Sequence, residues 1–477
     1  MPTIQTNKRR IYTLNKLKPE ITAVTFAKCS RSPDSFKNIA KELTEAKSSA
    51  FNEKYVVGYG HGSVAEHATL HMAIENVSIL ATKVLEDNRL GSYTEKSTRY
   101  QVYDRTRYYK PKNIMRSEFG KLYKETMNFI FDTYCSLFEP MKAFILKKYP
   151  KGAKENDMAY NAVLKSRTCD NIRYLLPTAT LTNLGMTTNA RVLEHAIVKL
   201  LSNPLDEMKQ IGEEVKSQAI KVTPTLLKYA QPNPYLVNTT KKLEELSHKI
   251  LPKNINPSIP VQIVNYDQDA ENRLITALLY NGSNLPYNQI WHEVKKMSQT
   301  DKENIIDEAL KNRSAFDAPI RELEHVYYTF DILMDYGAFR DIQRHRMCTQ
   351  TNQDVTIDHG FDTPPEIIEA GLKEPYLKAI NKAVALYQAM SPKFPKEAQY
   401  AVPLAFRKRV LFTWNLRELH HFISLRSTKK GHISYRRIAQ ACWQQLNEIH
   451  PLLAKYIRVD MTEGSSSWAA SMYKQVK

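Results

Sequence analysis

The sequence has few cysteines and no long hydrophobic run. Its five cysteines, Cys29, Cys135, Cys169, Cys348 and Cys442, are odd in number, far apart and contain no C-x-x-C pair. This pattern argues against a disulfide framework or a zinc cluster and fits a reducing cytoplasm, so no metal is expected. No stretch approaches the about 18 apolar residues of a membrane span. The basic residues near the start have no apolar stretch behind them, which argues against a secretory signal.

Common catalytic and nucleotide-binding signatures are also missing. The chain contains no G-x-G-x-x-G, no P-loop, no G-x-S-x-G and no H-E-x-x-H. Sequence evidence is therefore lacking for Rossmann dinucleotide sites, P-loop NTPases, α/β-hydrolases and zinc peptidases.

Positive charge is what the chain has in excess. Its 68 Lys and Arg against 50 Asp and Glu give a net charge of +18. Such a surface attracts polyanions such as nucleic acid, nucleotides, acidic cofactors or membrane lipids. Hydrophobic residues make up 42% and charged residues 25%, as in globular proteins. The length of 477 residues predicts two or three domains.

The chain repeats a set of landmarks in the same order, which indicates two related halves. A Glu-His pair recurs 258 residues apart (324 − 66), and a Pro with Asn, Arg and His at fixed distances recurs 226 residues apart (403 − 177). The second landmark reads Pro177, Asn189, Arg191, His195 and then Pro403, Asn415, Arg417, His421. We predict a first domain over 1–231, a proline-rich linker over 232–260 and a second domain over 261–477.

Each half follows an α+β pattern. We expect a strand, a helix, a long strand, a second helix and then several long helices, with the first strands near residues 21 and 261. Apolar residues at helical spacing predict long helices at roughly 117–147 and 374–392. The predicted architecture is two related domains, each a small mixed sheet packed with long helices.

Arginine and histidine residues are the first candidates for a site. Arg344, His345 and Arg346 stand together at the end of a predicted helix, which indicates a nearby anion or a solvated basic helix end. Arg417 and Arg426, with His420 and His421 between them, interrupt the apolar stretch 412–426, which reads as one helix. Charged residues on an apolar face usually have a bound partner.

The segment 91–100, GSYTEKSTRY, reads as a loop with a second candidate set. Ser92, Glu95, Ser97 and Arg99 suit the phosphate and ring edges of a nucleotide. Alternatively, Ser92 and Glu95 form the capping box of a turn. His61 follows a Gly-rich turn and is either a site residue or a surface histidine.

Taken together, these motifs resemble the flavin-dependent thymidylate synthase family. Its signature is a histidine loop ending in Glu-His, then R-H-R-x-x-S-x-x-E-x-S-x-R, and later R-x-x-x-P, N-x-R and a further Arg. The resemblance covers both halves, but neither half carries the signature complete. No cysteine follows a proline or precedes a histidine, so the nucleophile motif of the cysteine-dependent thymidylate synthases is missing.

The losses in the two halves are complementary. The first half keeps His61, Ser63, Glu66, Ser92, Glu95, Ser97, Arg99, Arg173, Asn189 and Arg191, but has Asp87, Asn88 and Arg89 at R-H-R and Leu200 at the last Arg. The second half keeps Arg344, His345, Arg346, Asn415, Arg417 and Arg426, but has Pro319, Thr349, Asn352, Asp354, Thr356 and Gln399 at the remaining positions. We therefore hypothesise a composite site to which both halves contribute.

The resemblance implies reductive methylation of dUMP to dTMP. Methylenetetrahydrofolate would supply the one-carbon group, FAD the hydride, and NADPH would reduce the FAD. The implied catalytic residues are Arg426, His61 and Ser97. The implied substrate-binding residues are Glu95, Ser97, Thr98, Arg99, Arg173, Arg344 and Arg426. The implied FAD-binding residues are Ser63, Glu66, Glu95, Arg344, His345, Arg346, Asn415, Arg417, His421, Asn189 and Arg191. A homodimer would form a pseudo-tetramer, since family members are homotetramers with sites between subunits.

Two other functions stay open. The chain could carry out a related flavin-dependent one-carbon transfer to a pyrimidine nucleotide. It could also be a non-catalytic tandem that binds nucleotides or nucleic acid through its positive charge. Nucleic acid is not expected, because the charge is mostly Lys spread along helices and no cluster of stacking aromatics accompanies it.

Overall fold

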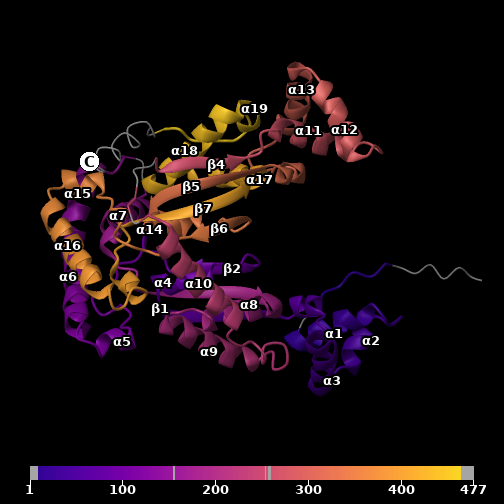
Figure 1. Cartoon of the computed structure of the whole chain (residues 1–477), viewed down its shortest axis with the longest axis horizontal. Coiled ribbons are helices and arrows are strands. Elements are labelled where there is room, and N and C mark those ends of the chain that lie inside the picture. The colour runs from indigo at the N-terminus through magenta and orange to yellow at the C-terminus, as the bar shows by residue number, and fades with distance from the viewer. Residues whose placement is uncertain (1–8, 15, 154–155, 253, 256–258, 463–477) are drawn as a thin grey trace, which may run out of the picture. The chain divides into compact units, whose positions relative to one another are not determined.

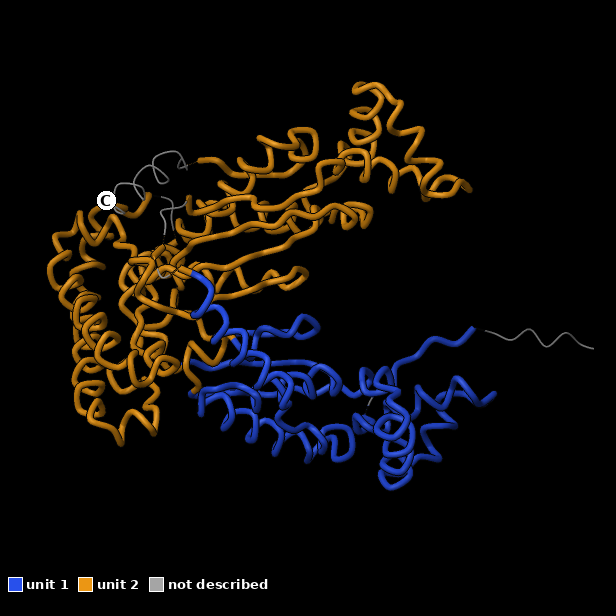
Figure 2. Tube along the Cα trace, viewed as in Figure 1, with its two compact units in different colours: residues 1–76, 84–95, 182–251 blue, residues 77–83, 96–181, 252–477 orange. Residues whose placement is uncertain are grey.

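The computed structural model describes residues 9–14, 16–153, 156–252, 254–255 and 259–462, in two compact units (Figure 2). Unit 1 comprises residues 1–76, 84–95 and 182–251, and unit 2 comprises 77–83, 96–181 and 252–477. Residues 96–181 therefore pack with the second half of the chain. The repeat boundaries rest on sequence similarity and stay a prediction. Both chain ends and part of the predicted linker lie outside the described residues.

Unit 1 combines a small sheet with helices (Figure 1). Its strands β1 (Thr69–Ser78), β3 (Leu181–Asn189) and β2 (Gly91–Glu95) lie in that order, with β2 antiparallel to β3. Strand β1 continues by two residues into unit 2, and the first residue of β3 also belongs to unit 2. The helices are α1 (Pro19–Cys29), α2 (Phe36–Glu42), α3 (Glu45–Phe51), η1 (Asn52–Gly58), η2 (Gly62–His67), α8 (Ala190–Leu201), α9 (Asp206–Ile220) and α10 (Pro234–Ile250). Helix α4 (Ile79–Leu85) runs from unit 2 into unit 1.

Two local predictions in unit 1 are wrong. The stretch near residue 21 is helix α1, not a strand, although Ile21, Val24 and Thr25 favour β structure. Pro19 stands in its first turn, and Val24 packs against Ile39 and Leu43, so tertiary packing outweighs local propensity. Residues 91–95 form strand β2 paired with β3, so the capping box is absent and the loop is confined to 96–100.

The sheet of unit 2 has the order β4-β5-β7-β6, from β4 (Val261–Tyr266), β5 (Tyr327–Asp335), β7 (Arg407–Asn415) and β6 (Cys348–Asn352). All three pairings are antiparallel, so the α+β class is confirmed, while this sheet is not mixed as expected. Alternate residues of β7 are buried, and Trp414 stacks on Phe412 and Phe422 with ring centroids 4.6 and 4.8 Å away. This stack is part of the core.

Long helices cover unit 2. The expected ones at 117–147 and 374–392 are α6 (Gly120–Lys148) and α16 (Lys373–Met390), which pack together, and α7 (Asp157–Ile172) packs on α6. The others are α5 (Lys112–Met115), η3 (Arg173–Leu175), α11 (Ala270–Tyr280), α12 (Tyr287–Lys296), α13 (Gln299–Leu310), η4 (Arg321–His325), α14 (Tyr336–Ile342), α15 (Pro365–Glu369), η5 (Glu397–Ala401), α17 (Leu416–Arg426), α18 (Ile433–Ile449) and α19 (Pro451–Ala454). Among the described residues, no helix is long and apolar enough to cross a bilayer.

The two halves meet symmetrically inside unit 2. The Thr178 amide donates to the Val402 carbonyl, and the Leu404 amide donates to the Leu176 carbonyl, both at 2.9 Å. Each donor and acceptor is exchanged by the 226-residue offset (402 − 176 and 404 − 178) that relates Pro177 to Pro403. These prolines form an antiparallel bridge themselves. The local two-fold arrangement supports the internal repeat.

Candidate active site

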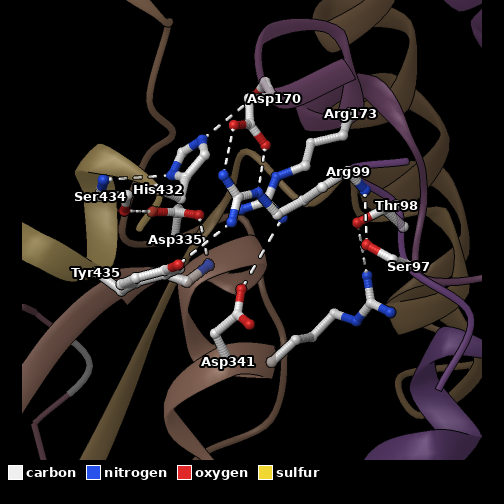
Figure 3. A network of polar contacts seen from close by, with 12 residues as sticks. Ser97, Thr98, Arg99, Asp170, Arg173, Asp335, Asp341, His432, Ser434 and Tyr435 are labelled. Carbon is white, nitrogen blue, oxygen red and sulfur yellow. Dashed lines mark hydrogen bonds and ion pairs between the residues drawn. The ribbon is translucent and has the colours of Figure 1, made fainter. Parts of the chain in front are cut away.

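Residues from both halves of the chain gather in one cluster within unit 2 (Figure 3). Arg99 follows strand β2, and Arg173 begins η3 directly after helix α7. Asp341 lies on α14, and Tyr435 lies near the start of α18.

Arg99 is fixed by a carboxylate from α7. Its Nε and Nη2 donate to Oδ1 and Oδ2 of Asp170 at 2.7 and 2.8 Å, a bidentate pair. Burial acts to lower the pKa of Arg99, but the hydrogen bonds and charge of Asp170 outweigh it and raise the pKa above its usual value. The Arg99 backbone amide donates to Ser97 Oγ at 3.1 Å, which holds the turn.

Arg173 is buried with unsatisfied donors. Its side chain is 2% exposed, and its Nε and Nη2 have no hydrogen-bond partner. Its nearest ion pair joins Nη1 to Asp341 Oδ2 at 4.0 Å, beyond hydrogen-bonding distance. A Cβ at Gly337 would lie 3.4 Å from Arg173 Nη2 and 2.9 Å from Asp335 Oδ1, so glycine allows this close approach. A buried guanidinium in this state favours an added anion.

Arg426, the last residue of α17, comes from the second half. Its Nη2 donates to the Asp341 carbonyl at 2.6 Å, its Nη1 lies 3.7 Å from Asp341 Oδ1, and its Nε donates to His345 Nε2 at 2.9 Å. Its guanidinium carbon lies 5.3 Å from the centre of the Tyr435 ring. Arg99 Nη1 donates to the hydroxyl of the same tyrosine at 3.3 Å. Tyr435 and Asp341 thus connect the cations of the two halves.

The start of α18 is tied to the same cluster. His432 Nδ1 accepts from the Ser434 amide at 3.2 Å as an N-cap, and His432 Nε2 lies 3.4 Å from the Asp170 carbonyl. Burial lowers the pKa of His432 to about 4, so the ring is neutral near pH 7. Burial, with Asp362 nearby, raises the pKa of Asp335 to about 6, and this carboxylate accepts from the Ser434 hydroxyl.

The charge balance of the cluster is positive. Four guanidinium groups, those of Arg99, Arg173, Arg340 and Arg426, stand against three carboxylates, those of Asp170, Asp335 and Asp341. Arg340, also buried, donates from Nη1 to Thr98 Oγ1 at 3.2 Å. Planar guanidinium groups recognise phosphate and carboxylate well, so the arrangement can bind an anionic ligand.

The other expected residues of unit 2 lie on the segments next to the cluster. Arg344 is exposed, His345 buried and Arg346 half-buried, between α14 and β6. Asn415 ends β7 and caps α17 by accepting from the Glu418 amide at 2.8 Å, so the apolar stretch 412–426 is not one helix. Arg417 donates to Glu324 at 2.9 Å and to the Pro319 carbonyl at 2.7 Å. The exposed His421 ring lies 5.3 Å from that of His345.

The remaining expected residues belong to unit 1. His61 and Ser63 line a cavity of about 490 Å³ together with Phe26, Phe51 and Tyr55. Asn189 caps α8, as Asn415 caps α17. Arg191 pairs with Glu66 at 2.5 Å. Glu95 is buried at the end of β2.

In the two-fold-related copy of the site, the equivalent side chains of unit 2 are bonded within the protein. Gln399 stands at the position of Arg173, accepts from the Val355 amide at 3.0 Å and donates to the Lys396 carbonyl at 3.2 Å. Lys396 occupies the position of Asp170 and pairs with Asp354 at 2.9 Å. Donors that are open to a ligand at Arg173 therefore have no equivalent at Gln399, whose amide is already hydrogen-bonded within the protein.

Several residues of the cluster were missed by sequence reasoning. Asp170 lies about one helical turn before Arg173, a spacing that could have drawn attention to it. Asp341 and Tyr435 carry no such signal, since their contacts with Arg173 and Arg99 join segments far apart in the sequence. Glu418 and His432 likewise act through residues on other elements.

Residues 13–225 and 262–452 match the family profile described as thymidylate synthase complementing protein, Thy1. A UPF0159 protein of Chlamydia pneumoniae is 35% identical over 434 residues, covering 87% of this chain and 82% of that protein. A UPF0159 protein of Thermoplasma acidophilum is 30% identical over 455 residues, covering 87% and 90%.

Two more distant matches are named flavin-dependent thymidylate synthases. A flavin-dependent thymidylate synthase of Clostridium tetani is 28% identical over 218 residues, covering 45% of this chain and 83% of that protein. A solved flavin-dependent thymidylate synthase of Helicobacter pylori, complexed with FAD and dUMP, is 17% identical, covers 42% of this chain and 100% of its own, and has a TM-score of 0.31. Because the profile matches both halves, the chain belongs to the thymidylate synthase complementing protein family, as its motifs indicated.

Proposed function

We propose that the protein is an FAD-dependent thymidylate synthase that converts dUMP to dTMP with methylenetetrahydrofolate and NADPH. Its active site would use residues of both halves of one polypeptide. The observation that carries this proposal is the meeting of Arg99 and Arg173 with Arg426 around Asp341 and Tyr435 in unit 2. Family membership and the named synthases among the relatives support the same reaction.

Arg173 and Arg99 are the proposed binding site for the nucleotide phosphate. The Nε and Nη2 groups of Arg173 lack acceptors, and a phosphate dianion offers several. Asp170 keeps the Arg99 guanidinium in one orientation before substrate arrives. Ser97 and Thr98, on the turn before Arg99, would lie at the sugar and pyrimidine end of the substrate.

Arg426 is the proposed electrostatic catalyst. Methylene transfer to the pyrimidine develops negative charge on the ring, and a cation held in advance stabilises such charge. Its contacts with His345, the Asp341 carbonyl and the Tyr435 ring fix the guanidinium from three directions. No cysteine nucleophile is required in this scheme.

The donor set next to the cluster fits FAD by its chemistry. Arg344 and Arg346 suit a diphosphate, and His345 and His421 provide rings beside them. When bound, FAD would supply the hydride that completes the methyl group. Asn415 and Arg417 hold the start of α17, so we propose that they shape the FAD site through this helix end. Asn189 and Arg191 hold the start of α8 in unit 1 and stay proposed cofactor-binding residues. His61, Ser63, Glu66 and Glu95 stay proposed site residues from unit 1.

The proposed assembly is a homodimer in the cytoplasm, equivalent to the homotetramer of single-repeat family members. Sedimentation of the purified protein tests it, with a dimer mass expected. A monomer would contradict the assembly and leave the chemistry of one chain to be tested separately.

Product analysis tests the reaction itself. Purified protein should bind FAD and convert dUMP, methylenetetrahydrofolate and NADPH to dTMP, identified by mass spectrometry. A hydroxymethylated or otherwise modified pyrimidine would instead support a related one-carbon transfer. Nucleotide binding with neither flavin nor turnover would support a non-catalytic tandem.

A further inference from the structure

Arg426 is connected to a glutamate that it does not touch. Glu418 Oε1 lies 3.0 Å from His345 Nδ1, and Arg426 Nε donates to His345 Nε2 at 2.9 Å. Glu418 and Arg426 lie at opposite ends of α17, about 12 Å apart along its axis at 1.5 Å per residue. The imidazole of His345 therefore links two side chains that extend from opposite ends of this helix.

The two hydrogen bonds of His345 fix which ring nitrogen carries the proton. Arginine can only donate, so Nε2 of His345 must accept and carry no proton. The single ring proton is then on Nδ1, where it donates to the Glu418 carboxylate. The carboxylate selects the tautomer of His345 that can hold Arg426.

The local sequence explains why Glu418 lies where it does. Asn415 caps α17 by accepting from the Glu418 amide, which places Glu418 in the first turn. The carboxylate is 11% exposed and the imidazole 3% exposed, so their hydrogen bond is shielded from water. His345 is further restrained because Cys348 and Gln350 donate to its backbone carbonyl.

We propose that Glu418 is a positioning residue, which acts through His345 to hold the Arg426 guanidinium in its working orientation. This inference rests on the proposed function, because it assigns a consequence to the orientation of Arg426. Glu418 belongs to none of the motifs that the sequence shows. Its effect would fall on the chemical step more than on nucleotide binding, since Arg99 and Arg173 provide the proposed phosphate contacts.

The hydrogen bonds from Glu418 through His345 to Arg426 also predict that kcat falls at acidic pH. The ionisable groups that shift the pKa of His345 are Glu418, Arg426 and His421, and burial, the largest effect, lowers this pKa. Protonation would place an N–H of His345 against the N–H of Arg426 and break their bond. The negative charge of Glu418 favours the protonated ring, so its removal moves the acid limb of kcat to lower pH.

The test compares Glu418→Ala and Glu418→Gln in the full-length protein. The alanine variant should lower kcat about 10-fold or more with the dUMP Kd changed by less than about threefold. The glutamine variant keeps an acceptor for Nδ1–H and should retain kcat within about threefold, with the acid limb at lower pH. Glu118→Ala, which removes an exposed ion pair with Lys393, is the control and should change neither kcat nor the dUMP Kd.

Two results would overturn the inference. One is a Glu418→Ala enzyme with kcat within about threefold of the wild type. The other is an equal loss of kcat and of dUMP binding in both variants. If the wild type makes no dTMP, the proposed function fails, and crystal structures still decide the positioning role. Displacement of the Arg426 guanidinium in Glu418→Ala, but not in Glu418→Gln, supports it, and an unmoved guanidinium contradicts it.

Discussion

Arg173→Gln gives the candidate site the residue that its two-fold-related copy already has. Gln399 is satisfied there by the Val355 amide and the Lys396 carbonyl. By the repeat offsets, the equivalent backbone groups are the Thr98 amide (355 − 257) and the Asp170 carbonyl (396 − 226). We therefore expect the substituted amide to be accommodated, while the buried positive charge is lost.

The structure sets the size and the sign of both effects. A hydrogen bond to a charged group contributes about 1.5–3 kcal/mol, which corresponds to a roughly 10- to 150-fold weaker affinity for dUMP. Without ligand, the wild-type protein buries guanidinium donors that have no partner, which costs about 1–3 kcal/mol. The charge of Arg173 also lowers the pKa of the carboxylates of Asp170 and Asp335, so its removal costs stability. Because these two effects oppose each other, Arg173→Gln should change the free energy of unfolding by less than about 1 kcal/mol.

Calorimetric titration with dUMP and urea unfolding measure the two effects. Arg436→Gln is the matched control, because Arg436 is also 2% exposed but donates to the carbonyls of Ser427 and Thr462 at 2.9 and 3.0 Å. This control should lose about 1–3 kcal/mol of stability and keep its affinity for dUMP. The reasoning is refuted if Arg173→Gln binds dUMP like the wild type, or loses as much stability as the control.

Two further predictions concern proton linkage and stoichiometry. The pKa of His432 is about 4 in the folded protein, below the ordinary histidine value of 6.5. The unfolded chain therefore takes up the proton first, and stability should fall by up to about 3 kcal/mol as pH drops from about 6.5 to about 4. His432→Asn keeps an N-cap acceptor and should remove this part of the pH dependence in urea unfolding at several pH values, whereas an unchanged slope would contradict the assignment. Because Gln399 and Lys396 are bonded within the protein in the two-fold-related copy, titration should give one dUMP per chain, and two per chain would show that this copy also binds.

Local patterns in the sequence predicted much of unit 2. The apolar periodicity of 117–147 and 374–392 corresponds to α6 and α16, because these helices bury one face against each other. The 226-residue offset appears again in hydrogen bonds between the halves. The prediction of a strand near residue 21 is wrong because contacts with α2 stabilise the β-branched residues of α1 as helix. Propensity does not report such contacts.

The composition of the candidate site was only partly predictable. Arg99, Arg173 and Arg426 stand in motifs, so the sequence identifies them. Asp170 and Tyr435 do not, because their contacts with Arg99 span 71 and 336 residues. Complementary losses between halves indicated a composite site, but only coordinates relate segments so far apart. For the same reason, Glu418 acquires a role only through His345.

The central claim is that one polypeptide supplies both halves of the cation cluster. Its most direct test is the activity of mixed dimers made by co-expressing Arg99→Ala and Arg426→Ala chains with different tags. If each site lies within one chain, every site lacks one arginine and the mixed dimer has no more activity than either variant alone. Recovery of about half the wild-type activity would contradict the account, because a site shared between two chains would then be complete at one of two positions.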